Sequence, residues 1–499
     1  MQYYLEFIVA GLGLVLLLWE AFAAPKKKAA LAIVGAVALT GVLAALIITS
    51  CSSCASDTPS WMDRFYSNDG DYTIFFKGFA LVSTILVLFM SYDYSKIVNK
   101  FTSPDGSDTN SGEFYCLPVF ACAGLMWMAS ATDLVSIFVA LELVTISFYV
   151  MVAFMRRNVG SLEAGVKYLI LGALSTGFLV YGIAWIYGST GTTSMESIQA
   201  TLQNVPALGS AYEINGNVGW VTSIQVDTSL LFGLALIIVA LGFKVGAAPM
   251  QLWIPDVYQG APTPITAFLS VASKAAGFGV AITILRPFLE SNYTQGSVAT
   301  ILVIMAAATL LYGNLSAIAQ TNFKRLLAYS SIAHAGFLLL GMATGNFEHV
   351  LFYLAIYLIM TFAAFFILAV LRSSDDSEEI SALNGLGKRN PTLALSLTII
   401  MAAMAGVPLT AGFWGKFFIF SDAVSNTDLI SWPVLVIAFL GAAAGFYYYF
   451  KVIRAIYWNA PTKETPIELP FISKVILIIL TAAIIILGVF PAPLECLIG

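Results

Sequence analysis

The sequence predicts an all-α polytopic membrane protein with about fourteen transmembrane helices, and its composition, its apolar segments and its loop charges each support this prediction. Of the 499 residues, 59% are hydrophobic and only 10% are charged, and the mean hydropathy is +0.88. A soluble domain carries roughly 25% charged residues. We expect no binding to nucleic acid, because no clustered basic face exists beyond Lys26–Lys28.

The apolar segments give the expected helices in order. They cover residues 3–22, 30–50, 73–91, 114–131, 133–154, 163–187, 228–249, 262–288, 297–318, 325–343, 349–371, 391–421, 431–450 and 471–490. A run of about 20 apolar residues is long enough to cross a hydrocarbon core of about 30 Å. The first segment lacks the basic start and the small-residue cleavage site of a signal peptide, so we interpret it as a retained helix.

The loop charges test this helix count independently. With residue 1 placed outside the cell, the cytoplasmic loops contain Lys26, Lys27, Lys28, Lys96, Lys100, Arg156, Arg157, Lys324, Arg325, Arg372, Lys388, Arg389, Lys451, Arg454 and Lys463. The outer loops contain only Arg64, with Lys77 and Arg286 near helix ends, and residues 188–227 contain no Lys or Arg. An excess of cations in cytoplasmic loops is the established sign of orientation. We therefore expect both termini to face the periplasm of a bacterial inner membrane.

Two of the segments break the rules for a continuous helix. Pro249 interrupts the seventh segment, and Gly406 and Pro408 interrupt the twelfth, five segments later. Broken helices in corresponding places are typical of inverted-repeat transporters, although ordinary proline kinks are the alternative. On the first interpretation, segments 4–8 and 9–13 are two inverted five-helix repeats. The expected units are flanking helices 1–3 in residues 1–113, the repeats in 114–290 and 291–460, and a flanking helix in 461–499.

Five ionisable residues lie inside these apolar segments. They are Glu142, Lys244, Lys274, His334 and Lys416. A central charge costs about 2.5–3.5 kcal/mol on insertion scales, and folding does not require it. Ionisable groups inside a membrane therefore indicate function, and they usually face the interior of the bundle and pair with each other.

Structural roles remain open for several of these residues. Glu142 could simply pair with a lysine, His334 could be a hydrogen-bonded core histidine, and Lys416 could stabilise the carbonyl groups freed by the second break. Lys167 follows Glu163 by four residues near the end of its helix, which is the spacing of an i,i+4 ion pair. We keep Glu163 and Lys167 as secondary candidates.

Lysine, glutamate and histidine together can form a proton relay. An unperturbed lysine, with a pKa near 10.4, is a poor proton carrier. Burial lowers the pKa of a lysine and a nearby carboxylate raises it again. A carboxylate that moves relative to a buried lysine can therefore load or release a proton. We predict such a relay along the five central residues.

The sequence contains no motif for a bound cofactor or metal. Its five cysteines are Cys51, Cys54, Cys116, Cys122 and Cys496, and they lack the spacing of zinc, haem or iron–sulfur sites. Cys51 and Cys54 either end a loop of small residues or form a disulfide. Nucleotide-binding glycine motifs are also absent, so we expect any redox chemistry to occur on other subunits.

Several long motifs resemble one known family. The segments LGFKVGAAPMQLWIPDVYQGAPTPITAF and SKAAGF closely resemble the core of the Mrp-antiporter-like subunits of respiratory complex I. Within that family, W-x-P-D-V-Y-Q-G-A-P is similar to the N-type subunits. DLVSIFVALELVTISFYVMVAF, SLEAGVKYLILGALSTGF, NFKRLLAYSSIAHAGFLLLG and GVPLTAGFWGKFFIF match in the same order. No segment for a long lateral helix follows the fourteenth span, which favours the N type over the L type.

The resemblance implies roles and partners. Glu142 corresponds to the glutamate of the fifth helix in the proton pathway of the family, and Lys244, Lys274 and Lys416 correspond to its lysines on the seventh, eighth and twelfth helices. The resemblance implies an M-type antiporter-like subunit and small K-, J- and A-type subunits as neighbours, besides membrane lipids. It places NADH, FMN, iron–sulfur clusters and quinone on partner subunits, with none on this chain.

Three other functions compete with a proton-translocating subunit of a quinone oxidoreductase. A Mrp-type monovalent cation/proton antiporter subunit is disfavoured by V-Y-Q-G-A-P. A symporter would bind its substrate at the broken helices, near the midplane. A structural scaffold is disfavoured by the five central ionisable residues.

The loop charges lead to a labelling prediction. A cysteine introduced at Asn215, in the cation-free loop, should react with an impermeant maleimide in whole cells, because this loop lies outside. A cysteine at Ser377 should react only after permeabilisation. The unsubstituted chain serves as the control for the native cysteines. Reversed labelling would reject the fourteen-span topology.

Overall fold

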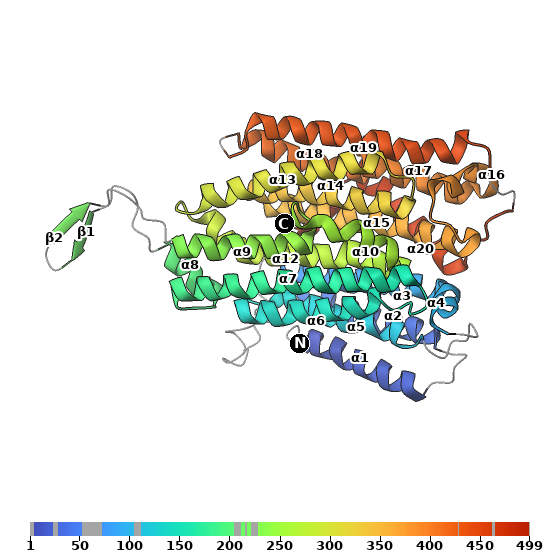
Figure 1. Cartoon of the computed structure of the whole chain (residues 1–499), viewed down its shortest axis with the longest axis horizontal. Coiled ribbons are helices and arrows are strands. Elements are labelled where there is room, and N and C mark those ends of the chain that lie inside the picture. Colours follow the sequence, from blue (N-terminus) through green and yellow to red (C-terminus); the bar gives the residue numbers. More distant parts are fainter. Residues whose placement is uncertain are drawn as a thin grey trace.

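The computed structural model describes residues 4–22, 28–51, 72–103, 111–203, 211–214, 217–220, 228–427, 429–461 and 465–498. Long helices lie side by side along the long axis of the molecule, with α1 at one edge and α19 at the other (Figure 1). A small hairpin of β1 and β2 stands apart from the bundle, beyond the end at which α8 lies (Figure 1). Helices thus form the whole body of the described protein.

The long helices and their parts have the following bounds. They are α1 (Leu5–Phe22), α2 (Ala30–Cys51), α3 (Thr73–Asp93), α5 (Glu113–Ser130), α6 (Leu134–Val152), α7 (Val159–Thr190), α9 (Thr228–Val245), α10 (Ile254–Gly260), α11 (Thr263–Phe268), α12 (Lys274–Glu290), α13 (Gln295–Ile318), α14 (Phe323–Ala343), α15 (Phe347–Asp375), α17 (Pro391–Ala405), α18 (Ala411–Ser425), α19 (Trp432–Trp458) and α20 (Phe471–Val489). The short elements are α4 (Ser95–Thr102), α8 (Met195–Gln203), α16 (Leu386–Arg389), α21 (Ala492–Ile498), β1 (Ala211–Ile214), β2 (Asn217–Trp220) and the non-α turns η4 (Met250–Trp253), η5 (Leu269–Ser273) and η6 (Ile380–Leu383).

Thirteen helical segments in the described residues are long and apolar enough to cross a membrane. They correspond to the predicted segments except the twelfth, which is divided into α17 and α18 of 15 residues each. The prediction of a polytopic all-helical protein with about fourteen spans is therefore confirmed. The predicted C-x-x-C does not bear on the fold, because Cys54 lies outside the described residues.

Both predicted breaks are present, and they have the same geometry. The glycine after each half-helix is left-handed, with φ +79° at Gly246 and +89° at Gly406. At each break two successive amides donate to one carbonyl, that of Gly242 in the first and of Ala402 in the second. This is how a left-handed glycine ends a helix while satisfying its last carbonyls. A further interruption was not predicted: π-helical η5 separates α11 from α12.

A second hydrogen-bond pattern also occurs twice. The bonds are Leu134 N to Thr193 O (2.9 Å) and Met195 N to Thr132 O (3.0 Å) at the start of α6, and Phe323 N to Glu378 O (2.8 Å) and Ile380 N to Thr321 O (2.8 Å) at the start of α14. The side chains of Asp133 and Asn322 cap these two helices. The two helices begin at opposite ends of the bundle (Figure 1), so the repeated pattern is inverted.

Several loop cations of the described residues meet at one end of the molecule, which we call the basic end. Lys100 pairs with Asp376 at 3.1 Å, and Lys324 pairs with Glu378 at 3.4 Å. Lys451 donates to the carbonyl of Gln320 at 2.8 Å. These contacts join loops that are far apart in the sequence, so the basic end is one connected surface.

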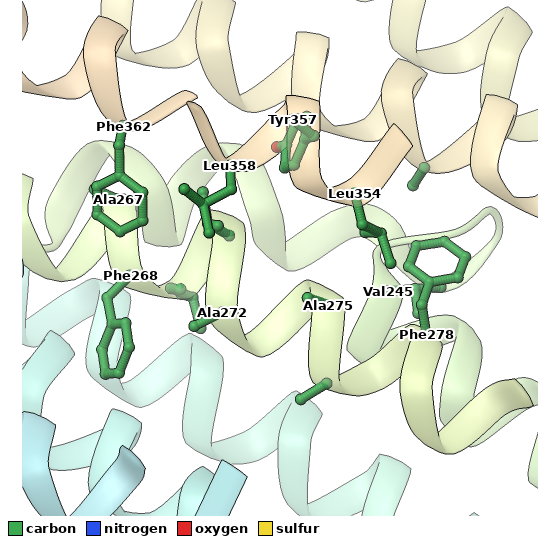
Figure 2. Close-up of a cluster of buried hydrophobic side chains, with 14 of the residues drawn as sticks. Val245, Ala267, Phe268, Ala272, Ala275, Phe278, Leu354, Tyr357, Leu358 and Phe362 are labelled. Atoms are coloured by element: carbon green, nitrogen blue, oxygen red, sulfur yellow. The ribbon is translucent and has the colours of Figure 1, made fainter. Parts of the chain in front are cut away.

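The centre of the bundle is formed by α14 and α15, which are the most buried of the spanning helices. Phe362 and Leu358 of α15 lie beside the small residues Ala267 and Ala272 of the interrupted eighth segment, and Leu354 lies near Val245 and Phe278 (Figure 2). Small residues on one helix let the neighbouring backbone approach closely. The interrupted segment is thereby held against the central helices.

The first three spanning helices also contain a buried charge pair. Lys77 of α3 lies 2.7 Å from Glu6 of α1, and both side chains are almost fully buried. Ser130 of α5 donates to the same carboxylate at 3.0 Å. This pair attaches α1 to the rest of the bundle.

The buried pair at the basic end gives a stability prediction. Arg389 forms two bonds to Asp375, at 2.8 and 3.0 Å, with both side chains buried. Asp375→Asn leaves the guanidinium buried without its counter-charge and should destabilise the protein by about 3–5 kcal/mol. Lys100→Gln breaks an exposed pair and should cost about 0–1 kcal/mol. Thermal unfolding of the two variants in detergent should therefore differ clearly, and equal melting temperatures would contradict the prediction.

Candidate functional site

The five predicted ionisable residues lie on five different helical elements that meet in the middle of the bundle. Lys274, His334 and Lys416 are buried, whereas Glu142 and Lys244 are partly buried. The structure separates them into two groups. Glu142 and Lys244 form the first, and the other three residues form the second.

In the first group, threonines are the direct partners of the charged residues. Thr176 of α7 donates to Glu142 at 2.8 Å, and Lys244 donates to Thr145 at 2.5 Å. Glu142 and Lys244 interact electrostatically, but no direct ion pair between them is present in the described residues. Glu142 and Lys244 are therefore neighbours without a direct bond. Lys244 binds Thr145, which follows Glu142 by three residues, about one turn of α6.

In the second group, Lys274 is bound by the central helix α14. Its ammonium group donates to the carbonyl and to the hydroxyl of Ser331. Tyr357 donates to the same hydroxyl at 2.8 Å and lies 2.9 Å from the hydroxyl of Ser270. Tyr357 stands between apolar neighbours of α15 (Figure 2). A row of hydroxyl groups therefore begins at Lys274.

His334 lies one turn beyond Ser331 on α14, and both of its nitrogens have tyrosine partners. Nδ1 is 2.7 Å from the hydroxyl of Tyr353, and Nε2 is 3.1 Å from the hydroxyl of Tyr449. The ring of His334 lies 5.2 Å from the ring of Tyr357. His334 is therefore a hydrogen-bonded core histidine that is also adjacent to the hydroxyl row.

Lys416 lies at the second break. Its ammonium group donates to the carbonyls of Met404 and Ala405, both at 2.9 Å, which are the last carbonyls of α17. The structural role considered for Lys416 is thus present. The ring of Tyr353 packs against Gly415, where a Cβ would lie 2.1 Å from the ring. This packing brings α18 against the tyrosine that binds His334.

The two groups approach each other where α9 packs on α12. A Cβ on Gly277 would lie 3.4 Å from the Cβ of Lys244, and Gly277 follows Lys274 by three residues. No hydrogen bond between described residues joins Lys244 to Lys274. The backbones are in contact here, while the side chains point to different partners.

The secondary candidates lie at the basic end, away from both groups. Lys167 pairs with Glu163 at 2.8 Å, as its spacing predicted. It also pairs with Asp256 of α10 at 2.7 Å, and Arg325 of α14 lies 3.2 Å from the same carboxylate. A pocket of about 420 Å³ opens beside these side chains.

Sequence reasoning missed the uncharged members of the site. Thr145, Thr176, Ser331, Tyr353 and Tyr357 contact the charged residues directly. One signal was available, because Tyr353 and Tyr357 are spaced i,i+4 in an otherwise apolar helix. Threonine and serine gave no signal, since they also bond to the carbonyls of their own helix.

The described residues contain no cluster of three or more His, Cys, Asp or Glu side chains that could hold a metal ion. Cys116 and Cys122 are buried and form no disulfide. The polar groups at the centre are amines, hydroxyls, one carboxylate and one imidazole. Such groups can exchange protons.

Comparison with known proteins identifies the family. The family described as "NADH:quinone oxidoreductase/Mrp antiporter, TM" matches residues 131–444. NADH-quinone oxidoreductase subunit N of Heliobacterium modesticaldum is 39% identical over 430 residues, which are 85% of this chain and 83% of that protein. A chain of respiratory complex I from Thermus thermophilus with bound aureothin is 30% identical, with a TM-score of 0.78 and 98% of each chain covered. A chain of the Mrp complex from Dietzia sp. DQ12-45-1b shares the fold, with a TM-score of 0.79 at 18% identity and coverage of 100% and 96%. This chain belongs to the antiporter-like membrane subunits of NADH:quinone oxidoreductase, in the group of subunit N.

Proposed function

We propose that this chain translocates protons through the two central groups of residues, driven by redox chemistry on other subunits of a complex I-type quinone oxidoreductase. The observation that carries the proposal is the row of hydrogen bonds from Lys274 through Ser331 to Tyr357, whose ring lies 5.2 Å from the ring of His334. Every member of this row can donate or accept a hydrogen bond. It lies in the most buried part of a membrane protein, where polar groups are costly.

The hydroxyl groups act as proton conductors between the charged residues. A hydroxyl can accept one hydrogen bond while donating another. Ser331 accepts from both Lys274 and Tyr357 in this structure, so the hydroxyls of Ser331 and Tyr357 turn before a proton passes from Ser331 to Tyr357. His334 continues the row through Tyr353 to the neighbourhood of Lys416. Where Lys244 and Lys274 are not directly bonded, a bridging water provides the step, because water-mediated bonds are nearly as favourable as direct ones.

Glu142 controls the proton affinity of Lys244 by its distance. A unit pair about 4 Å apart at an effective dielectric near 20 interacts by roughly 4 kcal/mol, and doubling the distance halves this energy. Lys244 is held by Thr145, one turn from Glu142. A swing of the lysine between these neighbours on α6 would load and release a proton.

The organisation and the surroundings of the chain are part of the proposal. The two glycine breaks and the duplicated pattern at α6 and α14 support inverted repeats in residues 114–290 and 291–460, with flanking helices in 1–113 and 461–499. The positive-inside rule supports a cytoplasmic basic end, periplasmic termini and a bacterial inner membrane. We further propose an M-type subunit and small K-, J- and A-type subunits as neighbours, and quinone, NADH, FMN and iron–sulfur clusters on partner subunits.

A cation/proton antiporter subunit is the alternative function. The shared fold with a Mrp complex chain makes it reasonable. The higher identity to subunit N sequences and the motif W-x-P-D-V-Y-Q-G-A-P favour the quinone oxidoreductase.

Substitutions at Glu142, Lys244 and Lys274 test the relay. Glu142→Gln keeps the shape and removes the charge, and Lys244→Ala and Lys274→Ala remove the carriers. Each should leave an assembled complex whose quinone reduction and acidification fall together by roughly tenfold, because blocked proton steps hold back the electron reaction. Glu142→Asp, which keeps the charge, should be milder. Both rates are measured in membrane vesicles at matched complex content.

Lys474→Ala serves as the matched control, because Lys474 is an exposed lysine of α20. It should retain both rates. Full activity and full pumping in both Glu142→Gln and Lys244→Ala would show that these residues are structural.

Assembly gives another test, because α1 exposes large apolar side chains outward. Phe7, Leu18 and Phe22 are 62%, 62% and 88% exposed in the isolated chain, which suits docking onto small neighbouring subunits. Deleting residues 1–95 should leave an insertable chain that no longer joins the complex. Leu18→Arg should weaken assembly while keeping α1–α3 intact. Native gels at equal membrane content of the chain measure this, and a normal yield of complex would refute the docking role.

A further inference from the structure

The proposed relay needs a route by which protons reach Glu142 from one end of the bundle. The pocket of about 420 Å³ at the basic end is the polar opening on that side, and Glu163, Ala164 and Lys167 of α7 line it. Thr176, which binds Glu142, lies on the same helix. The seam between α6 and α7 therefore leads from the pocket towards Glu142.

This seam is a continuous run of close contacts in antiparallel order. Listed from the basic end, they are Ser161 Oγ donating to Val152 O at 2.7 Å, Gly165 against Ala153, Gly172 against Tyr149, and Thr176 donating to Glu142 at 2.8 Å. Two of the four positions on α7 are glycines. The two helices are thus in close contact at four levels between the pocket and the carboxylate.

Tyr149 is a polar side chain of α6 in this seam, between the pocket and Glu142. Its hydroxyl is buried and has no hydrogen-bond partner in the described part of the chain. A buried hydroxyl without a partner destabilises the folded protein, and such groups in native proteins call for an explanation. Phenylalanine would fill the same space without this cost.

The Tyr149 hydroxyl has room because α7 carries a glycine opposite it. A Cβ on Gly172 would lie 2.0 Å from the Tyr149 oxygen, so any larger residue would displace the hydroxyl. The ring is held by Tyr168, with centroids 5.0 Å apart and planes at 76°. Tyr149 is also seven residues from Glu142, which is two turns on the same face of α6 and about 10 Å along its axis.

We propose that Tyr149 passes protons from the pocket at the basic end to Glu142, and this inference rests on the proposed function. The hydroxyl accepts a proton from a water on the pocket side and gives its own proton to a water on the Glu142 side. One O–H bond forms and one breaks, so no net charge remains on the tyrosine. Rotation of the hydroxyl then restores the first arrangement.

Tyr149→Phe tests the inference, because it removes only the hydroxyl. In vesicles containing the assembled complex, quinone reduction and acidification should fall together by roughly tenfold. The solvent deuterium isotope effect on turnover should rise, because proton uptake becomes rate-limiting. Gly172→Ala keeps the tyrosine and forces its hydroxyl to move, so it should give the same two changes.

Tyr115→Phe is the matched control, since Tyr115 is a fully buried tyrosine of α5 outside the seam, and it should change neither rate nor isotope effect. Unchanged turnover and an unchanged isotope effect in both Tyr149→Phe and Gly172→Ala would overturn the inference. A loss of complex content with normal activity per complex would also overturn it, because that result assigns Tyr149 a packing role. If Glu142→Gln is impaired while Tyr149→Phe is not, only the uptake route fails. If neither is impaired, the proposed relay fails with it.

Discussion

The satisfaction of backbone groups at the two helix breaks is the constraint on which the rest of the structure depends. A membrane interior offers no water to unpaired amides and carbonyls, so irregular backbone survives only where protein groups satisfy it. At the first break, Ala248 N donates to Thr309 Oγ1 at 2.8 Å, and Trp253 Nε1 donates to the carbonyl of Phe243 at 3.0 Å. At the second, Lys416 donates to two carbonyls.

The same requirement places polar side chains in the core and so makes the central site possible. Once α9 and α17 end inside the bundle, neighbouring helices must carry donors and acceptors at that depth. A buried side chain also satisfies a helix end at the basic end of the bundle. Lys324 donates to the carbonyl of Ala261 at 2.6 Å, just after α10 ends. Helix interruption, buried charge and hydroxyl partners are therefore parts of one solution.

The sequence predicted the helices well, and the charged residues inside them could be located from the sequence, because both leave strong local signals. Apolar length gives the spans, and a lysine such as Lys274 stands out in an apolar segment. The partners of the charges could not be predicted in the same way. Whether Lys244 meets Glu142 or Thr145 depends on side-chain geometry between α6 and α9, and the π-helical turn before Lys274 has no distinctive residue pattern. The burial of Glu6 with Lys77 was also missed, because both lie near the ends of their apolar segments.

The contacts of Lys416 have a consequence for how one residue can serve two purposes. An ammonium group has three N–H bonds, and the carbonyls of Met404 and Ala405 occupy two of them. The neutral amine left after loss of one proton still has two N–H bonds. Lys416 can therefore keep both hydrogen bonds to the last carbonyls of α17 whether it is protonated or neutral, because proton exchange involves only the third hydrogen. In the proposed relay, the structural anchor and the proton carrier would be the same nitrogen atom, so proton loss would not require the end of α17 to lose its hydrogen bonds.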